Sequence, residues 1–409
     1  MKLKRRRRNS DRSLYQICQQ QVVSSLKTCQ VKDTVVIGVT ACFILITLII
    51  IILSSRVNQC NGKQILQKLC EEYSRNEISG NLCFRLCIEK VIHLTNCIDD
   101  QQHVKTFLTQ DNLLIRAPVS LLHPDSLLKL PLGLTMESFT QDSSTYLTSR
   151  LGHSSSSYSH QDLINRLLQF ADFNENKELS LGEVQSLWQL MNNDEFLLLY
   201  LFHKQSAMLN INGTCGSLYG LRYHHSYILY NKEKRTLLSS LFENAYRWGL
   251  PTWKNRVKVV LGLLELADDL AETEGVRFYL CNVKPNKLGH TADHELVLSD
   301  LSELKSQKMM DDIMSNKTCG KDGDCVYTRY CQSTCDQNTG ECTGNIIQPT
   351  LWYICDIVRD YLLYDTVQPI QYDLKRYLEK CMEVQPGMMG FSAFLADFRT
   401  YLWEFINID

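Results

Sequence analysis

The sequence lacks an excess of either charge, because 43 lysines and arginines stand against 45 aspartates and glutamates in 409 residues. A formal net charge of −2 gives no global reason to expect nucleic acid or an acidic substrate as a partner. No internal repeat is visible along the chain. What remains is an ordinary globular composition, enough for one large domain or two medium ones.

One stretch has neither a charge nor a proline: residues 34–53, which read TVVIGVTACFILITLIIIIL. At about 1.5 Å per residue, this stretch would span roughly 30 Å as a helix, the thickness of the hydrocarbon core of a bilayer. We therefore predict one transmembrane helix. A cleaved signal peptide is the alternative, and Ser54 and Ser55 leave a little room for it.

The charges that flank this stretch predict its orientation. Nine lysines and arginines precede it against two aspartates, whereas only Arg56, Lys63 and Lys68 follow closely. The positive-inside rule places the N-terminus in the cytosol and the body of the chain on the lumenal or extracellular side, as a type II signal-anchor. The arginines at 5–8 either serve this topology alone, with attraction to anionic lipid headgroups, or also form an endoplasmic-reticulum retrieval signal.

Cysteine usage agrees with this topology. Of 17 cysteines, all but Cys18, Cys29 and Cys42 lie beyond the apolar stretch, and this even number predicts up to seven disulfides in an oxidising compartment. The disulfide candidates form two clusters, namely Cys60, Cys70, Cys83, Cys87 and Cys97, and then Cys319, Cys325, Cys331, Cys335 and Cys342.

The pairing of these cysteines cannot be read from the sequence. Cys215 and Cys281 stand apart from both clusters, either as a bridge or as buried free thiols. Zinc is the alternative for the second cluster, although the paired C-x2-C spacings of zinc sites are missing. The sequons at Asn212 and Asn316 predict glycosylation on the same side of the membrane.

Hydrophobic periodicity predicts the elements of the body. Short strands are expected within residues 103–119 and at 223–230, and the polar stretch 141–160 is expected to be an exposed loop. Helices are expected from residue 161, around 184–191, from 192 onward, at 255–271 and in the tail from 348.

Residues 172–183 lie between two of the predicted helices and carry the ligand pattern of a calcium-binding EF-hand loop. The ligand positions are taken by Asp172, Asn174, Asn176, the Glu178 carbonyl, Ser180 and Glu183. The sixth position favours glycine, and Lys177 pays about 1–2 kcal/mol there and opposes the ion. Weak calcium binding and a degenerate loop kept as a helix–turn–helix are the two alternatives.

A kinase-like pattern follows the helix predicted at 255–271. Residues 281–288, CNVKPNKL, resemble the catalytic loop of protein kinases, and Asp300 follows at the spacing of the Mg²⁺-binding aspartate. In this correspondence Asn282 takes the place of the catalytic base and Lys284 that of the catalytic-loop lysine. Lys287 takes the place of the metal-binding asparagine.

These features together resemble one family. They are a basic tail, a type II anchor, an N-terminal cysteine cluster, an EF-hand-like loop, a kinase-like segment and the block CGKDGDCVYTRYCQSTCD at 319–336. In this combination the chain is similar to the cysteine-rich divergent protein kinase domain proteins of the endoplasmic reticulum. These form the "family with sequence similarity sixty-nine" group, related to the deleted-in-autism proteins. The cysteine block and LGEVQSLW with NDEFLLL, within residues 181–199, carry the resemblance most specifically.

The resemblance implies an α+β, bilobal protein-kinase-like fold with an EF-hand-like helix–loop–helix inserted in the N-lobe, preceded by one transmembrane helix. It also implies a single-pass address in the endoplasmic-reticulum membrane. The implied parts are a cytosolic tail (1–33), a signal-anchor (34–53), a cysteine-rich lumenal segment (54–102), an N-lobe (103–222) with the insert at 161–191, and a C-lobe (223–409) with the cysteine cluster at 319–342.

The kinase positions themselves depart from the pattern. Arg116 stands where the resemblance places the ATP-pairing lysine, with Glu195 as its helix-C partner, and the planar fork of arginine needs more room beside the phosphates. Asn282 cannot accept a proton as a carboxylate would, and Lys287 puts a cation where Mg²⁺ should lie. No convincing glycine-rich loop precedes Arg116. These departures argue against productive binding of ATP and Mg²⁺.

We therefore predict a pseudokinase that acts by binding an unidentified lumenal protein, with sensitivity to calcium if the EF-hand-like loop is functional. The alternatives are an active atypical kinase for proteins or glycans, a disulfide-rich scaffold, and a type II glycosyltransferase with Asp322 and Asp324 as a D-x-D metal motif. Plain structural roles for Glu195, Lys284 and Asp300 are also open, as is metal binding by Asn286 in place of Lys287.

Overall fold

The structure, a computed structural model, describes residue 47 and residues 61–100, 104–119, 135–152, 160–232 and 245–406. The chain divides into two units, residues 1–61 and 62–409, and all the helices and strands named here lie in the second. The predicted membrane span at 34–53 falls outside the described residues except for Thr47, which is helical. In the part of the chain that the structure describes, no helix is both long and apolar enough to cross a membrane.

The second unit begins with a cysteine-rich segment that contains helix α3 (Gly62–Ser74) and the π-helix η1 (Phe84–Ile88). Cys70–Cys87 joins these two helices, and Cys83–Cys215 joins the segment to strand β4. Cys97 is also disulfide-bonded. The backbone passes so close to β4 that a Cβ on Gly80, whose φ is +147°, would lie 2.1 Å from the carbonyl oxygen of Thr214. A glycine is therefore required at this crossing.

A five-stranded antiparallel sheet follows, in the order β1-β2-β3-β5-β4. Its strands are β1 (Cys97–Asp100), β2 (Val104–Leu108), β3 (Leu113–Pro118), β4 (Ile211–Cys215) and β5 (Leu218–Arg222). The strands predicted within 103–119 are β2 and β3. All but the last residue of β3 are buried, as expected for a central strand.

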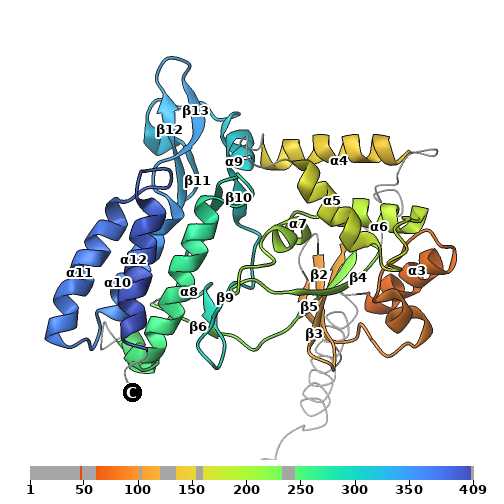
Figure 1. The fold of residues 1–409 in the computed structure, drawn as a ribbon, viewed down its shortest axis with the longest axis horizontal. Coiled ribbons are helices and arrows are strands. Elements are labelled where there is room, and N and C mark those ends of the chain that lie inside the picture. The colour runs from red at the N-terminus through yellow and green to blue at the C-terminus, as the bar shows by residue number, and fades with distance from the viewer. Residues whose placement is uncertain are drawn as a thin grey trace, which may run out of the picture. The chain divides into compact units, whose positions relative to one another are not determined.

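Among the described residues, four α-helices lie between β3 and β4 along the chain (Figure 1). They are α4 (Met136–Leu151), α5 (His160–Ala171), α6 (Leu181–Met191) and α7 (Asp194–Leu201). Helix α5 buries Leu163, Ile164 and Leu167, the residues whose spacing predicted it. Helices α6 and α7 are likewise the second and third predicted helices.

The prediction of an exposed loop at 141–160 was wrong for its first half, which belongs to α4. Phe139, Ser143, Leu147 and Leu151 form one buried face at helical spacing. The hydroxyls that suggested a loop bond back along the helix, as Thr145 Oγ1 does to the carbonyl of Gln141. Burial of one face and this local bonding outweigh the low helix propensity of serine and threonine.

The rest of the unit is a mainly helical lobe, which lies beside the sheet in Figure 1. Its helices are η4 (Ala245–Gly249), α8 (Trp253–Ala271), α9 (Gln307–Met314), η5 (Asp322–Asp324), α10 (Thr350–Leu362), α11 (Gln368–Glu383) and α12 (Phe391–Glu404). Helix α8 is buried on most sides and contacts α10 and α12, so the prediction of a buried helix at 255–271 is confirmed.

Short strands complete this lobe: β6 (Tyr227–Ile228), β7 (Phe278–Leu280), β8 (Gly289–His290), β9 (Leu296–Val297), β10 (Leu304–Ser306), β11 (Val326–Thr328), β12 (Cys331–Asp336) and β13 (Glu341–Ile346). The strand predicted at 223–230 shrinks to β6, because its partner β8 offers only two residues to pair with. One hydrophobic core runs from α5–α7 through α8 to α12, and the rings of Phe202 and Phe278 meet in it at 5.0 Å.

Disulfides hold the second cysteine cluster around β11–β13. The bridges are Cys281–Cys331, Cys319–Cys335 and Cys325–Cys342, while Cys355–Cys381 joins α10 to α11. The prediction of a disulfide-rich body is confirmed. Cys215 and Cys281 are both bridged, but to Cys83 and Cys331 and not to each other. The mixed helix and sheet content likewise confirms the α+β class.

Candidate functional site

The first part of the candidate site lies on the five-stranded sheet and centres on Arg116. This side chain is buried, and its Nη2 lies 3.2 Å from Oε1 of Glu195 in the first turn of α7. Its Nη1 donates a hydrogen bond to Thr106 Oγ1, whereas its Nε is buried without a partner in the described residues. The two residues that the sequence proposed as a pair therefore lie in contact.

The sheet register explains this arrangement. Thr106, Arg116 and Tyr219 face one another across β2, β3 and β5, which places their side chains in one row. The Tyr219 hydroxyl donates to Glu195 Oε2 at 2.8 Å, so the carboxylate is held from two sides. Burial, and next the charge of Glu195, raise the pKa of Tyr219 well above its ordinary value, so this hydroxyl stays protonated and remains a donor.

The second part of the candidate site lies in the helical lobe and centres on Asp300. Its Oδ2 lies 3.7 Å from Nζ of Lys287, and its Oδ1 accepts hydrogen bonds from the backbone N–H and the hydroxyl of Ser302. Burial raises the pKa of Asp300, but the bonds from Ser302 and the charges of Lys287 and Arg116 outweigh burial and lower it. Asp300 is thus a stable carboxylate, and both predicted cations act on it.

The loop between these residues is compact. The N–H of Lys284 donates to the carbonyl of Asn282, and those of Lys287 and Leu288 donate to the carbonyl of Lys284. Asn282 follows Cys281, whose disulfide to Cys331 fixes the start of the loop. Asn286 Oδ1 is buried without a hydrogen bond in the described residues, and its side chain lines a cavity of about 350 Å³ together with Lys284.

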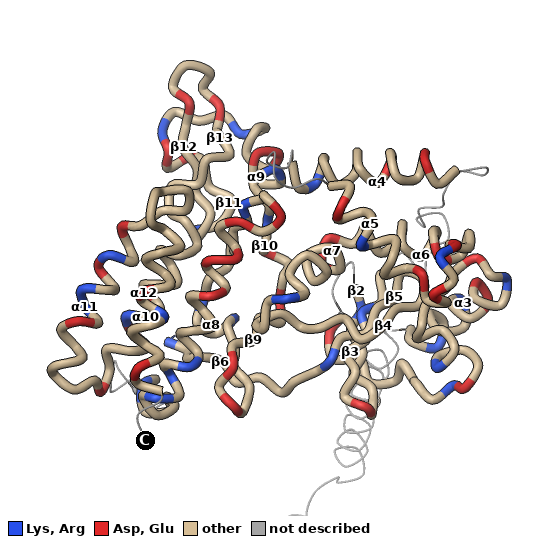
Figure 2. Tube along the Cα trace, in the orientation of Figure 1, with Lys and Arg blue, Asp and Glu red and all other residues tan. Residues whose placement is uncertain are grey.

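This site does not fit a Mg²⁺ ion. Octahedral magnesium requires carboxylate or water ligands at about 2 Å, and a neighbouring ammonium group repels it. Asp300 is the only carboxylate among the predicted loop positions, and it already pairs with Lys287. Figure 2 shows that Lys and Arg are interspersed with Asp and Glu along the described part of both lobes.

The calcium-loop residues lie between α5 and α6, as predicted. Both carboxylate oxygens of Asp172 accept backbone N–H groups, from Asn176 and from Lys177. Lys177 adopts a φ of +65°, the left-handed conformation that the sixth position of an EF-hand loop demands. Lys177 thus has the backbone conformation of this position although it is not a glycine.

Glu183, the last residue of the calcium-loop pattern, is fully buried. Its Oε2 accepts bonds from the N–H and the hydroxyl of Ser180, and its Oε1 accepts one from Asn174. The bond from the Ser180 N–H, together with the bond from the Glu183 N–H to Ser180 Oγ, forms the capping box of α6. Ser180 and Glu183 are therefore brought together by helix capping, and Asn174 joins them through its amide nitrogen. Asn176 and Glu178 also lie in the loop, where Asn176 Oδ1 accepts the N–H of Glu178.

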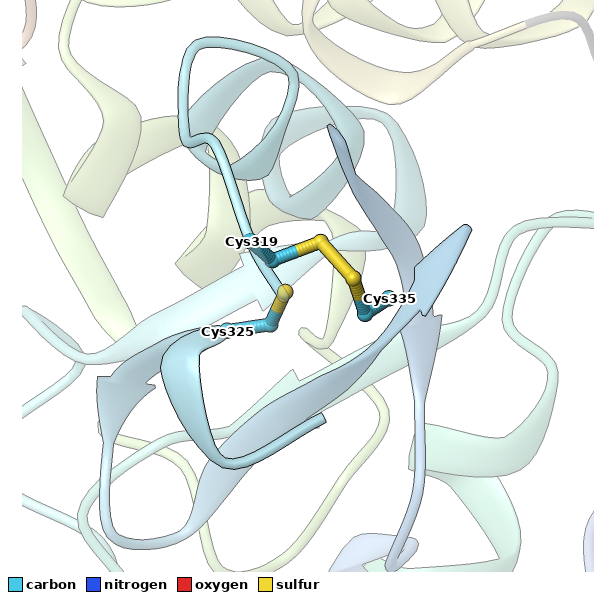
Figure 3. A group of neighbouring side chains, drawn as sticks. All are labelled: Cys319, Cys325 and Cys335. Atoms are coloured by element: carbon cyan, nitrogen blue, oxygen red, sulfur yellow. A yellow bond between two sulfur atoms is a disulfide. The ribbon is translucent and has the colours of Figure 1, made fainter. Parts of the chain in front are cut away.

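The cysteine cluster is no metal centre. Sulfur atoms of Cys319, Cys325 and Cys335 lie within 4.8 Å of one another, but Cys319 and Cys335 are bonded to each other (Figure 3). Cys325 is bonded to Cys342. Zinc binds thiolates, which none of these bridged sulfurs can provide.

The D-x-D motif of the glycosyltransferase alternative lies on η5 inside this cluster. Asp324 Oδ2 accepts the N–H groups of Gly320 and Lys321, and Asp322 Oδ1 accepts that of Cys335 at 2.7 Å. These carboxylates hold the turn in place. Asn212 and Asn316, the predicted glycosylation residues, are both exposed.

Sequence reasoning missed three residues of the site, namely Thr106, Tyr219 and Ser302. The first two could be found only from the strand register, which no sequence pattern states. Ser302 had a local signal, because a serine two residues after an aspartate often bonds the aspartate side chain in a turn. The cysteines of the bridge between α10 and α11, Cys355 and Cys381, were counted among the fourteen but not proposed as a pair.

Two family models match the chain. One is described as the protein-kinase domain of FAM69 and matches residues 187–384, a range that contains Glu195, Asn282, Lys284, Lys287 and Asp300. The other is described as the N-terminal cysteine-rich endoplasmic-reticulum part of FAM69 and matches residues 17–118, which include Arg116. The two matched ranges do not overlap and together cover most of the sequence.

Proposed function

This chain belongs to the FAM69 family, and from that premise we propose that it is a pseudokinase. Its protein-kinase-like domain would act by binding a lumenal protein and would not transfer phosphate. We propose that this domain lies on the lumenal side of the endoplasmic-reticulum membrane, behind a single type II anchor at residues 34–53, as the charges that flank this stretch and the resemblance imply. The name of the matching N-terminal model, which contains the word ER, supports that compartment.

One observation carries the proposal: the contact between Lys287 and Asp300. It puts the ammonium group of Lys287 beside Asp300, the only carboxylate among the predicted loop positions. Asn282, at the position of the base, has an amide that cannot accept the proton of a substrate hydroxyl, and loss of a general base typically costs about 10²–10⁴ in rate. Asn282 and Lys287 lie in the same loop, and neither residue supplies the group that is missing at the other position.

A phosphotransfer assay tests the proposal. The full-length chain, purified in detergent, is incubated with ATP and either Mg²⁺ or Mn²⁺, with casein as a general acceptor and with itself as acceptor. We expect no transfer above that of the Asp300→Ala variant. Transfer by the wild-type chain that disappears in Asp300→Ala would overturn the pseudokinase and establish an active enzyme.

An active atypical kinase is the second candidate, and the Arg116–Glu195 contact favours it. In protein kinases the equivalent Lys–Glu pair must be in place for activity. Here Glu195 on α7 would take the place of that glutamate. Nε of Arg116 has no hydrogen-bond partner among the described residues. Proteins and glycans are both open as acceptors. A melting temperature raised by ATP with Mg²⁺ but not by ATP with a chelator would favour this candidate.

Calcium sensitivity is a separate part of the proposal. It is supported by the loop shape, with Lys177 in the left-handed region, and by the gathering of Ser180, Asn174 and Glu183. Titration of the chelated full-length chain with CaCl2 tests it through the melting temperature, with MgCl2 as the control ion. A rise that Asp172→Ala abolishes would support calcium binding, and equal curves for both ions would contradict it.

A further inference from the structure

A second feature of the helical lobe is a cavity of about 350 Å³ beside the loop that contains Asn282. One wall is formed by that loop, from Val283 to Asn286, and another by Arg329 and Tyr330 in the turn between β11 and β12. The third wall is the first two turns of α10, with Trp352 and Tyr353.

The walls of this cavity are fixed to one another. The disulfide Cys281–Cys331 joins the residue before the loop to the residue after Tyr330. Thr328 Oγ1 donates to the Cys281 carbonyl at 2.6 Å, and the Tyr353 hydroxyl donates to the carbonyl of Arg329. A cavity held by a covalent bond and by hydrogen bonds between its walls is preformed, which reduces the entropy lost when a ligand binds.

The charges in the cavity are unbalanced. Lys232 pairs with Asp360, and the one acid in the lining, Asp356, pairs with Arg359. Arg329 stacks over the Tyr330 ring at 4.6 Å and bonds its hydroxyl, but it has no ion pair with an acid among the described residues. The same holds for Lys284, also within the described part of the chain. Two cations thus face the cavity without counter-charge.

The rest of the lining is mostly apolar or aromatic. Asn286 also lines the cavity, but its Oδ1 is enclosed by the protein and has almost no accessible surface. The Tyr353 ring stands nearly perpendicular to those of Trp352 and Tyr330, at 81° and 76°. These rings pack edge to face against one another, so no wide flat aromatic face is available on which a sugar ring could stack.

We propose that this cavity binds an acidic side chain of a polypeptide, with Arg329 and Lys284 as the partners of its anionic group. The proposal rests on the proposed function, since it names the class of ligand that the kinase-like domain would bind. Arginine suits both carboxylates and phosphates through its planar fork. A glutamate and a phosphorylated serine share this chemistry, so the test includes both.

Fluorescence anisotropy with labelled peptides tests the proposal on the full-length chain in detergent, without nucleotide. Three peptides of one length carry glutamate, phosphoserine or glutamine at the same positions, and inorganic phosphate serves as a competitor. We expect either anionic peptide to bind at least about tenfold more tightly than the glutamine peptide, the value of one charge-assisted hydrogen bond. Added salt should reduce this difference.

Variants locate the binding. Arg329→Gln with Lys284→Gln should remove the preference for acidic peptides, and Lys232→Gln in the same cavity should reduce it less because Lys232 already has Asp360. Arg376→Gln on α11, where Arg376 pairs with Asp373, should leave it unchanged. The melting temperature and circular dichroism of each variant show that it has folded.

Equal binding of all three peptides would overturn the proposal, as would a preference that survives the double substitution. Tighter binding of a uronic-acid oligosaccharide than of any peptide would overturn it in favour of a glycan. These outcomes are independent of the phosphotransfer assay. Phosphoryl transfer by a chain that prefers acidic peptides would contradict the pseudokinase proposal and support the proposed cavity. No transfer together with no preference for acidic peptides would support the pseudokinase and contradict the proposed cavity.

Discussion

The two halves of the candidate site hold their charges in opposite ways. In the first half, Arg116 on β3 and Glu195 on α7 are 10% and 20% exposed, Arg116 donates a hydrogen bond to Thr106, and Glu195 accepts one from Tyr219. In the helical lobe, Lys287 and Asp300 are 51% and 35% exposed, and the loop that carries Lys287 is fixed by the disulfide Cys281–Cys331. A buried ion pair stabilises the first half. A disulfide stabilises the second half, so its charged side chains can be substituted with little loss of stability.

The largest expected effect comes from removal of that covalent bond. Cys281→Ser with Cys331→Ser opens a loop of 50 residues, and the unfolded chain gains entropy worth at most about 4 kcal/mol. The apparent melting temperature under non-reducing conditions should fall by several degrees or more. Acidic-peptide binding should fall with it.

The matched control is Cys355→Ser with Cys381→Ser, which opens a loop of 26 residues away from the cavity. It should cost slightly less stability and leave peptide binding intact. Equal loss of peptide binding in both variants would show that the first disulfide has no particular role at the site.

The next largest effect should follow from Arg116→Ala. It leaves the carboxylate of Glu195 partly buried without its cation, and breaking such a pair costs about 3 kcal/mol. Thermal unfolding of the full-length chain measures the loss. Arg116→Lys keeps the charge and should cost less. A melting temperature for Arg116→Ala within a degree of the wild type would mean that the pair does not hold α7 against the sheet.

Lys287→Ala should have a much smaller effect on stability, below about 1 kcal/mol, since exposed ion pairs contribute little. It should instead change chemistry, because it leaves Asp300 with no neighbouring ammonium group. The measurement is the shift in melting temperature on addition of MnCl2, in wild type and variant. A shift that is larger in Lys287→Ala would confirm that this lysine excludes the metal, and identical shifts would contradict it.

The smallest effect is on pH dependence. The pKa of Asp300 lies below its usual value near 4, so its contribution to stability is present above about pH 4 and is lost as the pH falls further. Asp300→Asn should therefore lower the melting temperature slightly at neutral pH and leave it unchanged in strong acid. A difference that grows towards low pH would have the wrong sign and would refute the assignment.

The sequence predicted the elements with strong periodicity and the short-range motifs. Helices α5 and α6 follow from apolar residues at three- and four-residue spacing, and α7 and α8 follow from nearly continuous apolar stretches, whereas the fold class was implied by the resemblance. Asn282 and Asp300 could be found because the residues of a kinase-like catalytic segment lie close together in the sequence. Arg116 and Glu195 are far apart in sequence, and only the resemblance linked them.

The sequence could not predict what depends on pairing at a distance. The row of Thr106, Arg116 and Tyr219 requires the strand register, and the partners of Cys215 and Cys281 require the packing of three segments. Helix α4 was missed because serine and threonine are poor helix formers in isolation, and its stability comes from one buried face. Tertiary packing decided each of these cases.

The connectivity of the bridges has a consequence for how the protein is synthesised. Along the chain, the bridges Cys319–Cys335 and Cys325–Cys342 interleave with each other. Each of them also interleaves with Cys281–Cys331. On a ribosome that adds about 5–20 residues per second, Cys281 emerges seconds before its partner and meets Cys319 and Cys325 first. Any early bridge from Cys281 to Cys319 or Cys325 has to be replaced by thiol exchange once Cys331 has emerged, so we expect a disulfide isomerase to raise the yield of the folded chain.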